Sequence, residues 1–205
     1  MTRIGRSLGI TVTLSLAALG LQIPNAHADH LNRPSPHTAE YCYTILGELQ
    51  EEFGLPPIPR IEDVDLDRVA RPIQGVRDSV VAAIVRDGQV LMNKRGGEIG
   101  YGQWAVLGGK TDPGETLMQA LLRELGEEID VHELDLPRLV HVHYHYDGAS
   151  GQIFRVFVVR ATIGYHVKPI IKETKKILDL KWYPLDDLPT PLFSNFDDYF
   201  DDLLD

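Results

Sequence analysis

Apolar residues recur at every fourth position in the N-terminal part of the chain, and this spacing predicts a helix. The repeat covers residues 37–53 and consists of Tyr41, Ile45, Leu49 and Phe53. Positions four apart lie on one face of a helix, where we expect them to pack against the core. Gly54 and the prolines within residues 56–59 end the pattern, because proline cannot continue a helix. Residues 29–77 are therefore expected to form an N-terminal helix followed by an extended linker.

From residue 79 onward the pattern changes to short apolar runs separated by turn residues, which indicates strands. Asp87-Gly88 and residues 147–151 are typical of turns that join antiparallel strands. A helical pattern covers residues 115–129, and the acidic residues 196–205 are expected to form a last helix. The expected strands are 80–85, 90–92, 104–107, 139–146, 153–161 and 177–183. Because strands and helices do not alternate regularly, we expect an α/β fold with a mixed sheet covered by helices.

The first 28 residues have the composition of an export signal. Arg3 and Arg6 form a basic start, and residues 7–28 contain no charged side chain. A proline interrupts this stretch, and residues 26–28, Ala-His-Ala, match the small-residue pattern at which signal peptides are cleaved. We therefore expect cleavage after Ala28 and a secreted or periplasmic protein with no membrane anchor in its mature form. The alternatives are an uncleaved membrane anchor, since the uncharged stretch comes close to the required length, and a cytoplasmic protein.

The net charge of the chain limits its partners. The 205 residues include 20 Lys and Arg and 30 Asp and Glu, which gives a net charge of −10. Such an acidic surface repels the phosphate backbone of nucleic acids, and the sequence has no basic cluster with interleaved aromatics. We expect no nucleic-acid polymer as a partner. A small anionic substrate is compatible with this charge if a bound cation neutralises it.

The segment from Gly108 to Val131 has the features of a ligand-binding loop that leads into a helix. Glycines in the pairs at residues 108–109 and 113–114 allow tight turns and a close approach of the backbone to a ligand. Thr111 or Asp112 is expected to cap the helix that follows. The apolar stripe that faces the sheet is predicted to be Met118, Leu122, Leu125 and Ile129.

Three glutamates lie close together on another face of this helix. Glu124, Glu127 and Glu128 are three and four positions apart, and like charges at these spacings repel each other weakly. A helix tolerates this repulsion in water, so a solvated helix face explains the three glutamates by themselves. If the face lines a cleft, the carboxylate oxygens favour a hard divalent cation, above all Mg²⁺, with Mn²⁺ as the alternative.

The wider spacing of this segment resembles the signature of the Nudix hydrolase family, G-x5-E-x7-R-E-U-x-E-E-x-G-U, where U is aliphatic. The matching residues are Gly109, Glu115, Arg123, Glu124, Leu125, Glu127, Glu128 and Val131. Asp130 stands where the family has glycine, and Leu107 replaces the proline that is common before the glycine pair. Asp reaches the left-handed region more easily than most residues, so we expect the helix to end there. The resemblance implies a Nudix-type α/β/α sandwich with a mixed sheet over residues 78–205, preceded by the N-terminal helical extension.

The resemblance also implies a reaction, the metal-dependent hydrolysis of a diphosphate linkage in a small nucleoside diphosphate derivative. By position, Glu124, Glu127 and Glu128 match the metal-binding glutamates of the family. Gly108 matches the loop glycine whose carbonyl often completes the coordination. Phosphoryl chemistry depends on positioning and charge neutralisation more than on a covalent nucleophile, so this donor set suits the reaction.

The identity of the general base is less clear from the resemblance, because it varies between family members. Glu128 is the first candidate, and Glu173, in the loop before Trp182, is the second. Arg123 and Glu115 match a pair of residues that usually brace the loop against the helix through an ion pair. Such a brace acts by orienting the residues that touch the metal.

Further residues are candidates for contact with the substrate. The candidates are Lys94, Arg95, Lys110 and His143. The cations flank the loop and can bind phosphate oxygens, and a surface position without such contact is the alternative. His143 shares one face of a strand with His141 and His145. Alternating strand residues are about 6.6–7 Å apart, too far for all three imidazoles to bind one ion comfortably, and a solvent-facing strand edge is the remaining interpretation.

Two other functions fit parts of this pattern. A catalytically weak Nudix module that binds a nucleotide as a sensor is expected to lack one or more of the box glutamates, and none is missing here. An isomerase of isoprenoid diphosphates shares the fold but needs a cysteine in the core, whereas Cys42, the only cysteine, lies upstream. The sequence does not select between a monomer and a homodimer.

Overall fold

The computed structural model describes residues 42–44, 50–51, 53–148, 150–193 and 199–203. The expected signal peptide, residues 1–28, lies outside the described residues, as do the first positions of the predicted N-terminal helix. Within the described part of the chain, no helix is both long enough and apolar enough to span a bilayer.

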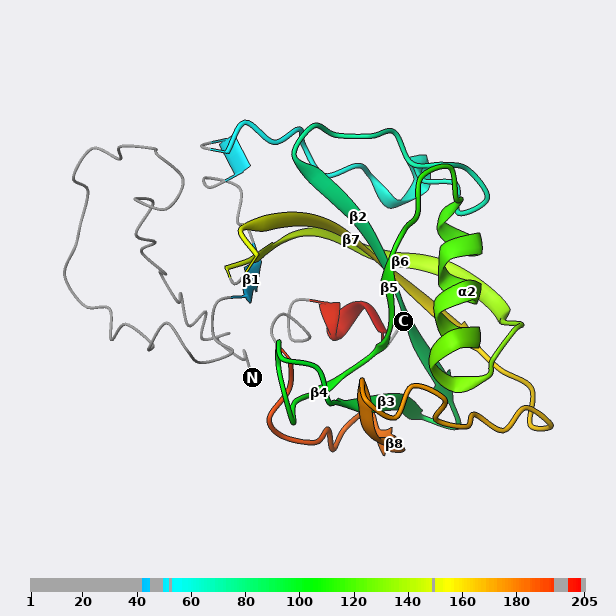
Figure 1. Cartoon of the computed structure of the whole chain (residues 1–205). Helices are drawn as coiled ribbons and strands as arrows, with labels where there is room; N and C mark the ends of the chain where they lie inside the picture. The colour runs from blue at the N-terminus through cyan, green and yellow to red at the C-terminus, as the bar shows by residue number, and fades with distance from the viewer. Residues whose placement is uncertain (1–41, 45–49, 52, 149, 194–198, 204–205) are drawn as a thin grey trace, which may run out of the picture. The chain divides into compact units, whose positions relative to one another are not determined.

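An eight-stranded mixed sheet forms the centre of the described part (Figure 1). The strand order is β1-β6-β7-β2-β3-β4, with β5 paired to β2 and β8 paired to β3. β2 and β7 run parallel, and the other pairs are antiparallel. The elements are β1 (Cys42–Thr44), the 3-10 turn η2 (Ile61–Asp63), β2 (Val76–Arg86), β3 (Gln89–Arg95), β4 (Trp104–Ala105), β5 (Leu107–Lys110), α2 (Leu117–Ile129), β6 (Asp135–Asp147), β7 (Gln152–Thr162), β8 (Ile177–Pro184) and the 3-10 turn η3 (Asp201–Leu203).

β2 is the strand that organises the sheet. Its first part lies between β7 and β5, and its last two residues pair with β3 through a tight hairpin. The hairpin turn is Asp87-Gly88, with φ angles of 52° and 72°, as the sequence predicts for a turn with two left-handed residues. The strands expected from the apolar pattern are confirmed. The expected strand 104–107 is divided between β4 and β5, and each of the others lies within a longer strand.

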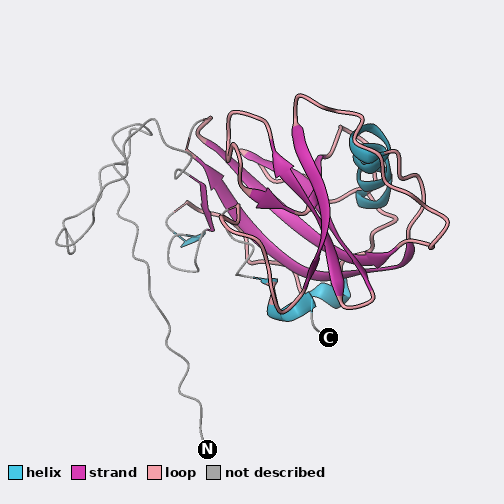
Figure 2. Ribbon diagram, turned by 90° about the horizontal axis from the view of Figure 1, so that it is seen from below, coloured by secondary structure: helices cyan, strands magenta, loops and turns pink. Residues whose placement is uncertain are grey.

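Two apolar clusters cover opposite faces of this sheet. Side chains such as Val80 and Ala82 of β2 pack with the buried face of α2 on one side. Their neighbours on the strand point to the other side, where Ala83 and Val85 pack near Tyr199 and Leu203 of the C-terminal segment. Figure 2 shows α2 and the C-terminal turn on the two sides of the sheet. This layering confirms the predicted α/β fold, with η3 as the described part of the expected last helix.

Helix α2 begins later, and is turned differently, than the sequence suggested. Its cap is Thr116 rather than Thr111 or Asp112, because Thr116 and Gln119 form a reciprocal capping box. Of the predicted stripe, Leu125 and Ile129 are buried, whereas Met118 and Leu122 are only partly buried. The other fully buried apolar positions are Leu117, Ala120 and Leu121. The helix ends at Asp130, which adopts the expected left-handed conformation with φ 61° and ψ 34°.

The N-terminal prediction is wrong at residues 42–44, whereas residues 50–51 are helical as expected. Cys42–Thr44 form strand β1, which pairs antiparallel with the end of β6, so a continuous helix over 37–53 does not exist. An edge strand offers unpaired backbone groups, and these hydrogen bonds outweigh the helical spacing of a segment rich in aromatic residues. The ring of Phe53 nevertheless lies beside the buried side chain of Tyr146, with the two ring centroids 6.3 Å apart.

Candidate functional site

Two glycines of β5 allow three elements to meet at the edge of the sheet. A Cβ atom on Gly108 would lie 2.3 Å from the carbonyl oxygen of Val80, and its φ of +136° is one that other residues rarely adopt. A Cβ atom on Gly109 would lie 2.4 Å from the carboxyl carbon of Glu124. The missing side chains therefore let β5 lie against β2 on one side and against the glutamates of α2 on the other.

Arg123 connects the loop after β5 to the helix. Its guanidinium donates two hydrogen bonds to the carboxylate of Glu115, at 2.9 and 3.1 Å, and one to the carbonyl of Lys110 at 2.9 Å. A further hydrogen bond of 2.8 Å reaches Glu124. The hydrogen bonds from Arg123 lower the pKa of Glu115, with the backbone N–H of Asp112 acting in the same direction. The ion pair expected between Arg123 and Glu115 is present, and the same cation also holds Glu124 in place.

Glu128 reaches from the helix to the strand and has an unusual ionisation. Its Oε2 accepts a hydrogen bond of 3.3 Å from the backbone N–H of Gly108. Burial, together with the negative charges of Glu124 and Glu173, raises the pKa of Glu128 to about 7, while the hydrogen bond from Gly108 and the charge of Lys176 act against the shift. The carboxyl groups of Glu124 and Glu173 are therefore close enough to disfavour the ionised form of Glu128.

The loop between β7 and β8 brings Glu173 to the C-terminal end of α2. Its backbone is anchored there, because the N–H of Ile170 donates to the carbonyl of Ile129 and that of Lys172 donates to the carbonyl of Glu128, both at 2.9 Å. Glu173 itself forms an ion pair of 2.8 Å with Lys176. Glu173 is the second candidate base from the sequence analysis. The structure places it close enough for its charge to raise the pKa of Glu128.

The ionisation of Glu128 predicts how the stability of the metal-free protein depends on pH. Its folded-state pKa of about 7 lies above the ordinary 4.5, so the folded protein binds the additional proton between these values. Stability is therefore highest at low pH within this window and falls as the pH rises through 7, by on the order of 3 kcal/mol. Chemical denaturation at pH 5 and 8.5, with a chelator present, should show this loss in the wild type and not in Glu128→Gln. Equal pH slopes in both proteins would contradict the assignment.

The carboxylates fit a hard divalent cation by their chemistry. Among the described residues, no three His, Cys, Asp or Glu side chains are already arranged around a common point. The reason is visible in the contacts: Arg123 bonds Glu124, and its Nη1 lies 3.7 Å from Glu127. A divalent cation between these groups would remove the repulsion that disfavours the ionised form of Glu128. The carboxylate oxygens of Glu124, Glu127 and Glu128 are donors of the kind that Mg²⁺ and Mn²⁺ prefer.

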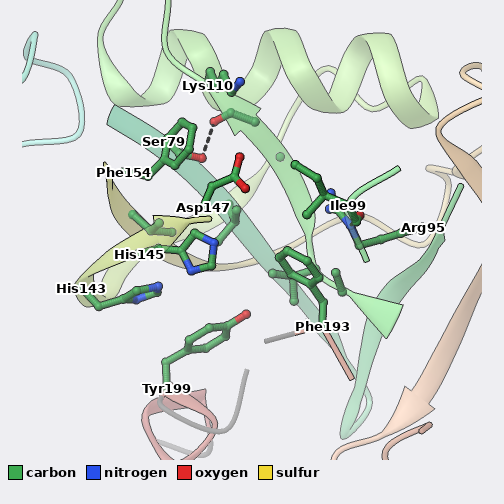
Figure 3. A pocket seen from close by; sticks show the side chains of 16 residues that line it. Ser79, Arg95, Ile99, Lys110, His143, His145, Asp147, Phe154, Phe193 and Tyr199 are labelled. Carbon is green, nitrogen blue, oxygen red and sulfur yellow. Dashed lines mark hydrogen bonds between the residues drawn. The ribbon is translucent and has the colours of Figure 1, made fainter. Parts of the chain in front are cut away.

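A cavity of about 280 Å³ opens on the sheet face opposite α2 and reaches the same glycine loop (Figure 3). Gly108, Gly109 and Lys110 line one end of it, and Arg95 and Ile99 line another side. The strands β2, β7 and β6 supply its floor with Ser79, Val81, Phe154, Val156, His143 and His145. Phe193 and Tyr199 of the C-terminal segment also line the cavity. The glutamate-bearing helix and this cavity therefore meet at Gly108 and Gly109.

The structure brings together most, but not all, of the predicted substrate contacts. Arg95, Lys110 and His143 line the cavity, whereas Lys94 does not and instead lies 5.8 Å from the ring of Trp104. His141, on the same strand face as His143, forms a 2.8 Å contact with Asp202 of the C-terminal segment. The sequence did not single out Ser79, Asp147, Phe154, Phe193 or Tyr199, which also line the cavity. For the strand residues the signal was alternation along β6 and β7, but it becomes useful only once the pairing of these strands is known.

His143 is held in its neutral form. Burial, together with the neighbouring His141 and His145, lowers its pKa to about 3. Its ring stacks on Tyr199, with centroids 6.0 Å apart and an angle of 12° between the planes. A neutral imidazole offers hydrogen bonds and a flat surface rather than positive charge, so His143 suits contact with a base or sugar better than with a phosphate.

The mixed sheet, the glycine-containing loop and the glutamate-bearing helix together define an α/β protein of the Nudix type. A family model described as NUDIX domain matches residues 76–204, which is more than half of the chain. The chain therefore belongs to the Nudix family. A crystal structure of a MutT NUDIX hydrolase from Burkholderia pseudomallei is similar, with a TM-score of 0.58 and 34% identity, over 62% of this chain and 98% of that one.

Two curated relatives are similar in sequence over part of the chain. The human 8-oxo-dGDP phosphatase NUDT18 is 38% identical over 95 residues, which are 44% of this chain and 27% of that protein. The CTP pyrophosphohydrolase of Escherichia coli K12 is 38% identical over 77 residues, which are 31% of this chain and 57% of that protein. The chain thus spans 27% and 57% of the length of these two relatives.

Proposed function

We propose that this chain is a divalent-cation-dependent pyrophosphohydrolase that cleaves a phosphoanhydride bond in a nucleoside diphosphate derivative or triphosphate. The observation that carries the proposal is that the Gly108 loop contacts Glu124 and Glu128 on one side and lines an aromatic-lined cavity on the other. The glutamates offer oxygen ligands for a cation that binds phosphates, and the cavity offers flat surfaces for a base. The names of both curated relatives support the proposal, because each describes an enzyme that acts on a nucleotide.

In such a reaction some residues of the chain would bind the cation, and others would orient the residues that bind it. When bound, Mg²⁺ or Mn²⁺ supplies neutralisation of the phosphate charge and a lower pKa for the attacking water. Glu124, Glu127, Glu128 and the carbonyl of Gly108 are the groups that would hold it. Arg123 orients Glu124 through their 2.8 Å hydrogen bond and so acts as a positioning residue.

Glu128 is also the residue best placed to accept a proton from water. A general base works best when its pKa lies near the working pH, and that of Glu128 is about 7. Glu173 is the second candidate. At the rim of the cavity, the cationic groups of Arg95 and Lys110 can bind phosphate oxygens and hold the scissile bond near the loop.

The experiment that tests this function is a substrate panel with the purified chain. Nucleoside triphosphates, nucleoside diphosphates, nucleotide sugars and dinucleoside polyphosphates are incubated with Mg²⁺ or Mn²⁺, and the products are separated by ion-exchange chromatography. We expect at least one compound to be cleaved at a phosphoanhydride bond and cleavage to stop when a chelator is added. A folded protein that cleaves none of these compounds with either cation would refute the proposed function.

Gly109→Ala is expected to lower this activity far more than it lowers stability. The new methyl group would overlap the carboxylate of Glu124, which can rotate away because it is the flexible end of a side chain. Displacement of one carboxylate should reduce kcat/KM about 10- to 100-fold, with little change in Tm. Gly97→Ala is the matched control, since nothing lies within 4 Å of the Cβ position at Gly97. Equal losses of activity in the two variants would argue against this role of Gly109.

A further inference from the structure

One cation beside the glutamates of α2 lies outside the signature segment and has no role in the reaction described above. Lys176, in the loop before β8, forms an ion pair with Glu173, with 2.8 Å between its Nζ and the Oε2 of the glutamate. That oxygen is shielded from solvent, and within the described residues no well-aligned hydrogen bond reaches it. The charge of Lys176 is therefore what compensates this side of the carboxylate.

The backbone of the loop brings the two members of this ion pair together. The N–H groups of Lys176 and Ile177 both donate to the carbonyl of Glu173 at 2.9 Å, which makes a tight turn. The carbonyl of Lys176 accepts a 2.6 Å hydrogen bond from the N–H of Gly96, just after β3. A Cβ atom on Gly96 would lie 2.8 Å from the carbonyl oxygen of Lys175, so the glycine lets the loop approach the strand. The ion pair is thus a built part of the fold.

The charge of Lys176 also reaches two of the glutamates that would hold the cation. Its pKa is raised by the contact with Glu173, together with the negative charges of Glu124 and Glu128. In return, the charge of Lys176 opposes the rise in the pKa of Glu128. The loop is joined to the same part of α2, because the N–H of Lys172 donates to the carbonyl of Glu128 at 2.9 Å. One ammonium group therefore acts on three carboxyl groups.

An ammonium group and a divalent cation compete for such carboxylates. The same negative charges stabilise both of them, and the two positive charges repel each other when they lie close together. Arg123 is tied to Glu115 and to the carbonyl of Lys110, so it keeps its place whatever the glutamates bind. The side chain of Lys176 is 59% exposed, and its flexible stem allows the ammonium to move into water.

We propose that Lys176 is an internal counter-ion of Glu124, Glu128 and Glu173, which competes with the divalent cation and so sets the cation concentration that the protein needs. The proposal rests on the function proposed above, and it adds a positioning residue from a distant loop. Lys176 holds Glu173, the second candidate base, in the cation-free protein and releases it when the charge of these carboxylates is compensated otherwise.

Cation binding by the full chain tests this role without any substrate. The affinity for Mn²⁺ is measured by electron paramagnetic resonance of the free ion for the wild type and for variants of Lys176. Methionine removes the charge and keeps an unbranched stem, so we expect Lys176→Met to bind Mn²⁺ about 10-fold more tightly, as befits the loss of one nearby positive charge. Lys176→Arg keeps the charge and should stay within about threefold of the wild type.

Lys175→Met is the matched control, because it changes the net charge equally at the neighbouring position. Lys175 is exposed and forms no ion pair within the described part of the chain. In about 0.15 M salt, where charges more than about 8 Å apart are largely screened, its affinity for Mn²⁺ should stay close to that of the wild type.

Thermal denaturation gives a second measurement that is independent of activity. Without metal, Lys176→Met should have a lower Tm than the wild type, because Glu173 loses its partner. A ligand that binds the folded state stabilises it more when it binds more tightly. The same concentration of Mn²⁺ should therefore raise the Tm of Lys176→Met more than that of the wild type or of Lys175→Met.

The outcomes separate this proposal from the function on which it rests. If Lys176→Met binds Mn²⁺ no more tightly than the wild type, Lys176→Arg or Lys175→Met, the proposal is overturned, whatever the protein hydrolyses. Failure of all four proteins to bind Mn²⁺ at millimolar concentrations overturns it as well. If the affinities change as expected but the wild type cleaves no phosphoanhydride, the counter-ion role is correct and the catalytic function is wrong.

Discussion

Glu128→Gln is expected to lower kcat for phosphoanhydride hydrolysis by at least about 1,000-fold while leaving the protein folded. Glutamine keeps the shape of the side chain and an oxygen that can accept the hydrogen bond from Gly108. It removes one charged ligand of the proposed cation site and the proposed acceptor of the proton from water, and each of these losses costs orders of magnitude in rate. Steady-state kinetics with excess Mg²⁺ measure the effect, and circular dichroism verifies the fold.

The same variant is expected to be more stable than the wild type above pH 7 when metal is absent. The wild type must then keep a partly buried carboxylate ionised beside Glu124 and Glu173, and the variant does not. Glu133→Gln is the control, because the carboxylate of Glu133 is 68% exposed and contacts only His166 among the partners that the structure gives it. Activity above one tenth of the wild-type value in Glu128→Gln would remove this residue from the reaction.

The sequence predicted which residues of the Gly108 loop and α2 lie together, because these residues are close in the chain. Glu124, Glu127 and Glu128 are brought together by helical periodicity alone, and Gly109 is adjacent to the loop that faces them. Arg123 and Glu115 are separated by only eight positions, so their ion pair needs no knowledge of the sheet. The left-handed end of the helix at Asp130 is likewise a property of one residue.

The cavity was harder to predict because it depends on how distant strands pair. Ser79 lies beside Val156 in the parallel β2–β7 pair, and Val156 lies beside His143 in the β6–β7 pair. A shift of one residue in either pair would turn a different set of side chains into the cavity. Alternation along each strand was visible in the sequence, but the register that unites the strands was not.

Two of the local errors have the same origin. The predicted helix over residues 37–53 was displaced at Cys42–Thr44 by pairing with the edge of β6, a partner about a hundred positions away. The stripe on α2 was predicted from residue type, whereas packing against the sheet buried Leu117 and Leu121 and left Met118 and Leu122 at the margin. In both cases a tertiary contact decided between local alternatives that were close in energy.

Arg123→Ala is expected to lower kcat/KM by about 100-fold and the free energy of unfolding by about 2 kcal/mol. The guanidinium satisfies the carboxylates of Glu115 and Glu124 and the carbonyl of Lys110 at once, and its side chain is only 27% exposed. Without it, Glu124 and Glu127 lose the cation that separates them, and the loop that carries Lys110 loses its link to α2. Kinetics at saturating Mg²⁺ and urea denaturation at pH 7.5 measure the two effects.

The geometry of the contacts also predicts the order of the variants. Lysine keeps the charge but cannot reach Glu115 with two hydrogen bonds while bonding Glu124 and Lys110, so Arg123→Lys should fall between the wild type and Arg123→Ala, with a loss of about 10-fold. Arg60→Ala is the matched control. It breaks an ion pair of 3.0 Å with Asp63, but the side chain of Arg60 is 74% exposed, and exposed pairs contribute little to stability. If Arg123→Ala behaved like Arg60→Ala, the ion-pair network around Arg123 would have no part in positioning the glutamates.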